Sequence, residues 1–135
     1  MSTTLMVNLP VQDLAKSTHF FAEMGFSFDK RFGNEHINTL VVSDDGYVKL
    51  VAAAMFKTFT KREVADASSA ELALQMRVDS RQRVDELVDK ALAAGGQRAN
   101  ETNDQGFIYG RSFSDLDGHL WDVFYIDPAT LQDQA

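Results

Sequence analysis

The chain carries one pattern of strand, helix and further strands twice within 135 residues. The first copy has an extended segment at residues 5–9 and an amphipathic helix at 13–24, followed by a glycine and more extended segments. The second copy repeats this order with an extended segment at 72–78 and a helix at 80–94. A repeat of this length indicates two copies of one supersecondary unit, and neither copy covers its own sheet alone. The pattern predicts an α+β fold of two paired modules with the functional site between them.

Chain length limits how this repeat can be organised. At 135 residues and 44% hydrophobic composition, the chain is long enough for one compact domain with a real core and too short for two independent domains. We therefore expect a single domain over residues 1–135. Within it, the first module covers about 1–53, a connector covers 54–70 and the second module covers about 71–127. We interpret the connector as a solvated linker in preference to a binding lid.

Charge and composition exclude several classes of function. The formal net charge of −7 disfavours binding to nucleic-acid phosphates or anionic lipid, and leaves neutral or cationic small molecules as the easier ligands. The absence of cysteine excludes disulfides, thiolate zinc sites and cysteine nucleophiles. No apolar run approaches the roughly 20 residues that span a bilayer. These features predict a cytoplasmic protein without a nucleic-acid or membrane partner.

Local signals place the elements. The helix at 80–94 has one apolar stripe, with Ser80 as its cap, and the helix at 13–24 has Asp13 as its cap. Glycines end both helices. Strands are expected near residues 26–32, 37–43, 47–53, 107–114 and 119–126, with the weakest strand signal at 97–101.

Asp122 is the residue most indicative of a binding site. It alternates with apolar residues in the last strand, and Leu120 and Phe124 share its face. An exposed row would rarely be so apolar, so a cavity position is favoured over a solvated sheet face. If the preceding turn is a two-residue hairpin loop, Arg111 lies opposite Asp122 and Tyr109 lies opposite Phe124. This register predicts an ion pair between Arg111 and Asp122.

Three stretches together resemble the vicinal oxygen chelate superfamily, which includes glyoxalase I, bleomycin-resistance proteins and extradiol dioxygenases. They are Val11-Gln12-Asp13-Leu14, Phe20-Phe21 with Gly25-Phe26, and Phe113-Ser114-Asp115-Leu116-Asp117-Gly118-His119. The resemblance implies paired βαβββ modules whose sheets curl around a cavity, often completed in a homodimer. We therefore also expect a homodimer, since short curled sheets leave edges that a symmetric partner would cover.

The resemblance also implies where a metal would bind in metal-dependent relatives. Carried over by position, the four ligand positions are Met6, Leu50 or its neighbour Lys49, Ala73 and Asp122. Only Asp122 keeps a metal-binding side chain, whereas a catalytic divalent ion needs about three N or O donors. We predict that the family metal site is lost and that no cofactor is bound. A slip of two residues leaves a divalent-metal set of Asn8, Glu71 and Asp122 as an alternative.

Two functions fit these residues. The first is metal-free binding of a small molecule in a cavity that needs only apolar walls and a few polar groups. The expected ligand-binding residues are Asn8, Gln75, Tyr109, Arg111, Asp122 and Phe124. The alternative is a metal-dependent lyase or extradiol-dioxygenase-like enzyme that acts on a vicinal dioxygen substrate. The histidines His19, His36 and His119 are interpreted as structural, because none has a second ligand at suitable spacing on its own face.

Overall fold

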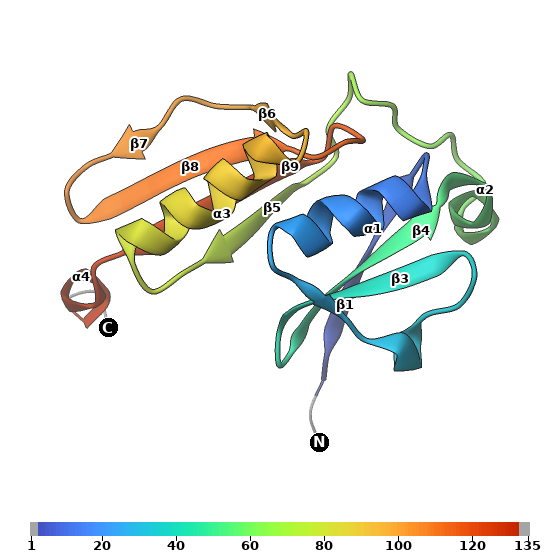
Figure 1. Cartoon of the computed structure of the whole chain (residues 1–135), viewed down its shortest axis with the longest axis horizontal. Coiled ribbons are helices and arrows are strands. Elements are labelled where there is room, and N and C mark those ends of the chain that lie inside the picture. The colour runs from blue at the N-terminus through green and yellow to red at the C-terminus, as the bar shows by residue number, and fades with distance from the viewer. Residues whose placement is uncertain (1–2, 133–135) are drawn as a thin grey trace. The chain divides into compact units, whose positions relative to one another are not determined.

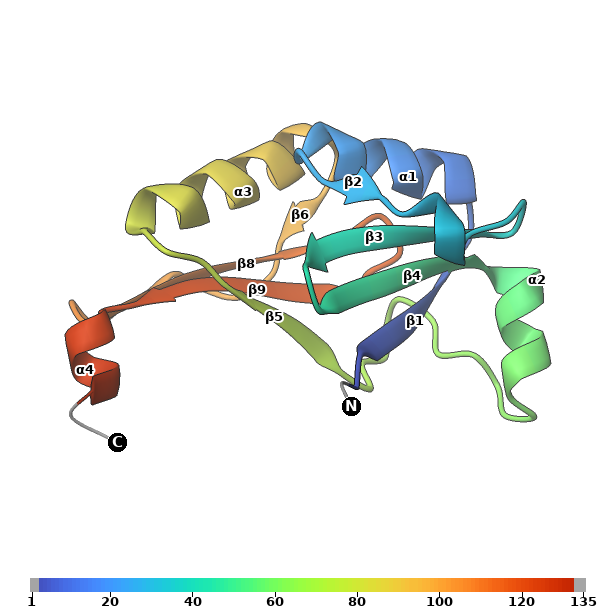
Figure 2. The same cartoon turned by 90° about the horizontal axis from the view of Figure 1, so that it is seen from below.

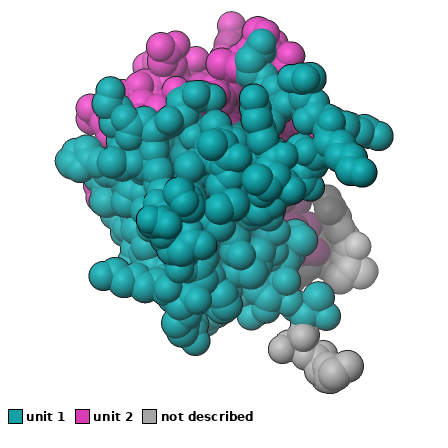
Figure 3. Space-filling view, turned by 90° about the vertical axis from the view of Figure 1, so that its right-hand side faces the viewer, with its two compact units in different colours: residues 1–66 teal, residues 67–135 magenta. Residues whose placement is uncertain are grey.

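The computed structural model describes residues 3–132. The chain forms two compact units, residues 1–66 and 67–135, which Figure 3 shows in different colours. Each unit has one sheet and one long helix, and the order of elements in each is strand, helix and further strands (Figure 1). The predicted α+β class and the βαβββ order of the modules are confirmed.

The first unit contains a four-stranded sheet of order β1-β4-β3-β2, in which β1 runs parallel to β4. Its strands are β1 (Leu5–Val11), β2 (Ser27–Phe28), β3 (Ile37–Ser43) and β4 (Gly46–Ala52). Its helical segments are α1 (Leu14–Glu23), η1 (Lys30–Phe32), α2 (Ala53–Phe56) and η2 (Lys57–Phe59). Helix α1 covers one face of β3 and β4 (Figure 2).

The second unit repeats this plan with the order β5-β9-β8-β6, and the additional short strand β7 pairs with β8. Its strands are β5 (Ala73–Arg77), β6 (Gln97–Arg98), β7 (Asn103–Asp104), β8 (Ile108–Ser114) and β9 (Leu120–Ile126). Its helices are α3 (Arg81–Ala93) and α4 (Pro128–Gln132). Strand β5 runs parallel to β9, as β1 does to β4, and α3 covers one face of β8 and β9 (Figure 2).

The predicted helix boundaries are confirmed together with their physical cause. The Asp13 carboxylate accepts a hydrogen bond from the backbone N–H of Lys16 at 3.0 Å, and the Ser80 hydroxyl accepts one from Arg83 at 3.0 Å. Each bond satisfies a donor that the first helical turn leaves unpaired. After α1, Gly25 adopts a φ of 100°, a conformation that L side chains rarely enter.

The cores lie between each long helix and its sheet. In the first unit the buried residues include Leu9, Val11, Phe20, Phe21, Met24, Leu40 and Leu50. In the second unit they include Val84, Leu87, Val88, Ala91, Phe113, Trp121 and Val123. The rings of Phe113 and Trp121 stack with their centroids 6.1 Å apart. The predicted apolar stripe of the second helix is therefore the face that packs on its sheet.

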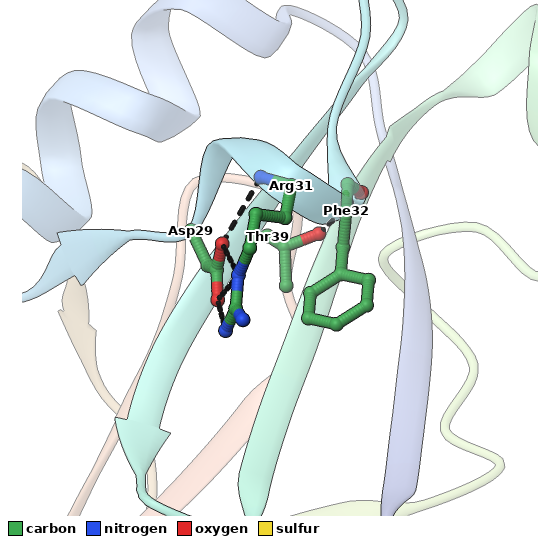
Figure 4. Close-up of polar contacts among 4 residues, drawn as sticks. All are labelled: Asp29, Arg31, Phe32 and Thr39. Carbon is green, nitrogen blue, oxygen red and sulfur yellow. Dashed lines mark hydrogen bonds and ion pairs between the residues drawn. The ribbon is translucent and has the colours of Figure 1, made fainter.

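The strand expected at 26–32 is shorter than predicted because the chain turns at Asp29. Strand β2 ends at Phe28, and the Asp29 carboxylate then accepts hydrogen bonds from the backbone N–H of Arg31 at 3.0 Å and from its guanidinium at 2.7 Å. The Thr39 hydroxyl donates to the carbonyl oxygen of Phe32 at 2.8 Å. These contacts, shown in Figure 4, stabilise the 3₁₀ turn η1 in place of a continued strand.

Other differences concern short segments. The weak signal at 97–101 corresponds to a strand of only two residues, and the two-residue strand at 103–104 had no sequence signal. The start of the expected connector is helical at 53–59, and residues 128–132 form a helix that the pattern did not predict.

Candidate functional site

The face of the second sheet opposite α3 carries Asp122. Trp121 and Val123 are buried in β9, and Asp122 points to the other face because neighbouring side chains of a strand alternate. Asp122 lies between Gln75 of β5 and Ser112 of β8 in the sheet register. The Gln75 amide donates a hydrogen bond from Nε2 to Asp122 Oδ2 at 3.3 Å. The sheet thus aims a carboxylate and an amide away from the core.

A pocket of about 390 Å³ opens on this face. Its lining combines carboxylates and side-chain amides with apolar surface, and consists of Gln75, Asn100, Glu101, Asn103, Ile108, Gly110, Asp122 and Phe124. Within the described part of the chain, this lining contains no basic residue. Its charge therefore suits a neutral or cationic ligand better than an anion.

Gly110 widens the pocket because it has no side chain. It pairs with Phe124 in the register, and an added Cβ would lie 3.5 Å from the Cβ of Phe124, which is ordinary van der Waals contact. The backbone does not require glycine here. A larger residue at this position would instead fill space that is open to a ligand.

One wall of the pocket was missed by the sequence interpretation. Asn100, Glu101 and Asn103 come from the segment between β6 and β8, which crosses beside the sheet. The backbone N–H of Asn100 donates to the Ser112 hydroxyl at 2.7 Å, and Asn103 pairs with Gly110. The unbroken polar run from Asn100 to Gln105 was the available signal, but a run of this kind is also typical of a solvated loop.

The predicted register of the last hairpin is wrong. Ser114 pairs with Leu120, so residues 115–119 form a five-residue loop in place of the expected two-residue turn. As a result Arg111 pairs with Val123, and Asp122 lies opposite Ser112. Arg111 and Asp122 therefore lie on opposite faces of the sheet, and the predicted ion pair between them does not form.

Tyr109 and Arg111 instead connect the sheet to α3. The Arg111 guanidinium lies 2.9 Å from both Asp85 and Asp89, and the Tyr109 hydroxyl donates to Asp85 at 2.6 Å. The hydrogen bond from Tyr109, aided by Arg111, holds the pKa of Asp85 below its usual value. The same bond and partial burial raise the pKa of Tyr109. These side chains stabilise the helix on the sheet and do not line the pocket.

The loop between β8 and β9 is organised by the buried carboxylate of Asp115. This carboxylate accepts hydrogen bonds from Trp121 Nε1 at 3.0 Å and from the backbone N–H groups of Asp117 and His119 at 3.0 Å each. His119 Nδ1 lies 2.9 Å from its second oxygen. Gly118 has a φ of 85°, which lets the chain turn back into β9. The Asp115 carboxylate thereby adds to the backbone hydrogen bonds of the loop, which join Asp115 N–H to the His119 carbonyl oxygen and Gly118 N–H to the Asp115 carbonyl oxygen at 3.1 Å each.

The same loop brings together three residues of metal-binding type. Ligand-type atoms of Asp115, Asp117 and His119 lie within 4.8 Å of one another. The hydrogen bonds to Asp115 already account for the arrangement, since they hold a buried carboxylate that would otherwise be costly. We interpret this group as a structural feature of the loop.

His119 makes stability depend on pH. Burial disfavours its charged form, but the hydrogen bond and charge of Asp115, with a contribution from Asp117, outweigh burial and raise its pKa above 6.5. Because the folded state favours protonated His119, this residue stabilises the fold fully at pH below 6.5. The contribution is lost as pH rises through the pKa that His119 has in the folded state. We expect the free energy of unfolding to fall with pH above 6.5. Urea unfolding at a series of pH values measures this, and His119→Gln should flatten the profile; an equal slope in both proteins would contradict it.

Comparison with known proteins shows the family. A model of the Glyoxalase/Bleomycin resistance protein/Dioxygenase superfamily matches residues 4–123. The chain belongs to this superfamily. The resemblance drawn from the sequence motifs is therefore confirmed, and it extends over nearly the whole chain.

Several solved structures resemble this chain over nearly its full length. A hypothetical protein from S. aureus is 27% identical, with a TM-score of 0.79 over 93% of this chain and 94% of that one. A bleomycin resistance determinant encoded on transposon Tn5 is 17% identical, with a TM-score of 0.64 over 93% and 98%. An antibiotic-binding protein from a Streptomyces species is 21% identical, with a TM-score of 0.67 over 94% and 98%. No curated protein gave a significant match.

Among residues 3–132, none of the helices has the length and hydrophobicity that crossing a membrane requires.

The residues at the superfamily's metal positions do not fit a metal ion. Ala73 has no donor atom, and Met6 offers only a thioether, which is a poor ligand for hard divalent ions. Of the two residues considered in β4, Leu50 is fully buried, while Lys49 pairs with Asn8 on the other face and carries a positive charge. Glu71, part of the alternative set, precedes β5 and is exposed. Of the four carried-over positions, Asp122 alone keeps a side chain suited to a divalent ion.

Proposed function

We propose that this member of the superfamily binds a small neutral or cationic molecule in the pocket on the open face of the second sheet, without a resident metal. The observation that carries the proposal is the Asp122–Gln75 pair, which lies in a pocket also lined by Ile108 and Phe124 and, among residues 3–132, by no basic side chain. Such a combination of apolar surface and few polar groups is typical of small-molecule sites. The proteins of Tn5 and Streptomyces, described as a bleomycin resistance determinant and an antibiotic-binding protein, support a binding role.

The ligand contacts that we propose are Gln75, Asp122 and Phe124, joined by Asn100, Glu101 and Asn103 from the wall. Tyr109 and Arg111 are left out as direct contacts because their side chains point to α3. Asn8 lies on β1 of the first unit beside Lys49 and stays a prediction from the sequence.

Three probes of one shape and different charge test the proposal. Benzamidine is cationic, benzamide neutral and benzoate anionic, and each is small enough for the pocket. Titration into ¹⁵N-labelled protein is followed through the side-chain amide signals of Gln75, Asn100 and Asn103, which line the pocket. We expect saturable shifts with the first two probes, at affinities of about 1 mM, which corresponds to about −4 kcal/mol. Benzoate should shift them least. Shifts confined to other amides, or none, would contradict the proposal, and a shift of Asn8 would support its predicted role.

The absence of a metal is tested separately. We expect protein purified without an affinity tag or a chelator to contain Zn, Ni, Fe and Mn at well below one equivalent per chain by mass spectrometry. Asp122 is the one carried-over ligand position that keeps a metal-binding side chain, and we interpret Asp115, Asp117 and His119 as a structural group. A near-equimolar content that disappears in Asp122→Ala would overturn this expectation. That result would favour the alternative function, a metal-dependent lyase or dioxygenase-like enzyme.

We also propose that the protein is a homodimer located in the cytoplasm. The strands β1 and β5 are edges of their sheets, and Leu5 and Leu72 near these edges are 75% and 44% exposed. Covering such edges with a second copy is a common solution. Light scattering at micromolar concentration should give twice the chain mass of 15.0 kDa. A mass of one chain would contradict the dimer.

A further inference from the structure

The short strand β7 joins the pocket to the helix side of the sheet. Asn103 pairs with Gly110 and lines the pocket, whereas Asp104 pairs with Tyr109, whose side chain contacts α3. Neighbouring side chains of a strand point to opposite faces. An interaction that holds the Asp104 side chain on the α3 side of the sheet therefore also fixes the position of Asn103 on the pocket side.

Arg81 of α3 makes that interaction. Its Nη1 and Nη2 atoms donate to the two carboxylate oxygens of Asp104 at 3.2 and 2.6 Å, a bidentate contact. The guanidinium also lies over the ring of Tyr109, 4.3 Å from its centroid, and the Tyr109 hydroxyl is held by Asp85 at 2.6 Å. Arg81 is thus fixed by an aromatic ring as well as by its ion pair, which favours one orientation of the planar group.

Few other contacts hold this wall. Strand β7 pairs with β8 at only Asn103 and Asp104. Outside that ladder, the segment is held by hydrogen bonds between Asn100 and Ser112 at 2.7 and 3.5 Å and by one from the backbone N–H of Gln105 to the carbonyl oxygen of Ile108 at 3.0 Å. Within the segment, the Asp104 carboxylate accepts from Gly106 at 3.1 Å and the Gln105 amide donates to Asn103 at 3.0 Å. The side chains of Asn100, Glu101 and Asn103 are all exposed and add no core packing. The Arg81–Asp104 ion pair adds a contact to α3 that these hydrogen bonds do not supply.

We propose that Arg81 is a positioning residue for the ligand pocket, acting through Asp104 to hold the wall at residues 100–104 against the open face of the sheet. The inference rests on the proposed function, because it assigns this wall to ligand binding. Arg81 does not line the pocket itself. Replacing Arg81 changes none of the residues that line the pocket. It removes the contact that holds the wall, which carries three of them: Asn100, Glu101 and Asn103.

The chain contains a matched control on the same helix. Arg83 forms an ion pair with Glu86 whose side chains are 40% and 45% exposed, against 43% and 47% for Arg81 and Asp104. Arg83→Met removes an equally exposed ion pair without touching the wall. Arg81→Met removes the ion pair with Asp104 that holds the wall. We expect amide hydrogen exchange at residues 100–106 of the ligand-free protein to become about fivefold faster in Arg81→Met and to stay unchanged in Arg83→Met, in keeping with the strength of a well-ordered exposed pair.

Binding and spectroscopy complete the test. Benzamide binding should weaken about fivefold in Arg81→Met and in Asp104→Asn, and no further when both substitutions are combined. Arg81→Lys should weaken it less, because lysine keeps the positive charge but cannot make the bidentate contact. The hydrogen bond from Arg81 holds the pKa of Asp104 below 3.8, so this pKa, followed by NMR, should rise in Arg81→Met. Equal exchange in the two methionine variants, or wild-type affinity in Arg81→Met, would overturn the role of Arg81. Lack of benzamide binding by the wild-type protein would instead overturn the proposed function, and the exchange comparison still decides whether Arg81 orders the wall.

Discussion

Replacing Asp115 with alanine should lower the free energy of unfolding by about 4 kcal/mol. Its side chain is 3% exposed and accepts hydrogen bonds from the Trp121 indole and from two backbone N–H groups of the loop. Alanine would leave these donors without their acceptor, and removing one partner of a buried charged network costs about 3–5 kcal/mol. The loss should increase unfolding throughout the second unit, because the loop joins β8 to β9.

Urea unfolding followed by circular dichroism measures this change, since Trp121 fluorescence is itself affected by the substitution. Asp115→Asn keeps the shape and one acceptor oxygen, and should recover only part of the stability because its NH₂ group faces N–H donors. Asp45→Ala, in the exposed turn between β3 and β4, removes the same charge and should change stability by about 0.5 kcal/mol or less. A change below about 1 kcal/mol for Asp115→Ala would show that the loop has another source of order.

The second large effect concerns ligand affinity. Asp122→Asn removes the charge of the pocket carboxylate but keeps its size and an oxygen that can accept from Gln75. A hydrogen bond to a charged group contributes about 1.5–3 kcal/mol, so benzamidine should bind about ten- to hundredfold more weakly. Benzamide, which has no charge, should bind within about twofold of its wild-type affinity. The amide titration described above measures both.

Glu86→Gln is the control for this effect. It removes the same unit of charge from α3, on the opposite side of the sheet from the pocket. Equal weakening of benzamidine by the two variants would mean that the net charge of −7, and not a contact with Asp122, attracts the cation. Loss of benzamide binding in Asp122→Asn would mean that Asp122 shapes the pocket instead of pairing with the ligand.

The parts of the fold that depend on local chemistry were predictable from the sequence. The Asp13 and Ser80 caps and the glycine after α1 each act within one helical turn, so their spacing alone identifies the helix ends. The apolar stripe of α3 predicts its buried face for the same reason. The family resemblance then extended these local signals to the order of the modules.

The candidate site was harder to predict because its contacts are not local. The sequence from Asp115 to Gly118 is compatible with a short turn, whereas the longer loop is stabilised by hydrogen bonds from His119 and Trp121 to the Asp115 carboxylate. That change exchanged the sheet faces of Tyr109 and Arg111 relative to Asp122, as a slip of one residue always does. The wall was missed because β7 is two residues long and depends on Arg81, which precedes Asp104 by 23 positions.

The parallel pairing of β5 with β9 determines when the pocket can form during folding. Gln75 and Asp122 are separated by 47 positions, and their contact requires the first and last strands of the unit to meet. Contacts of such long sequence separation form late, after the cost of closing the intervening chain. The proposed site is thus complete only once β5 has paired with β9, so we expect a nascent or partly unfolded chain to lack it. A bound ligand would accordingly stabilise the finished unit as a whole.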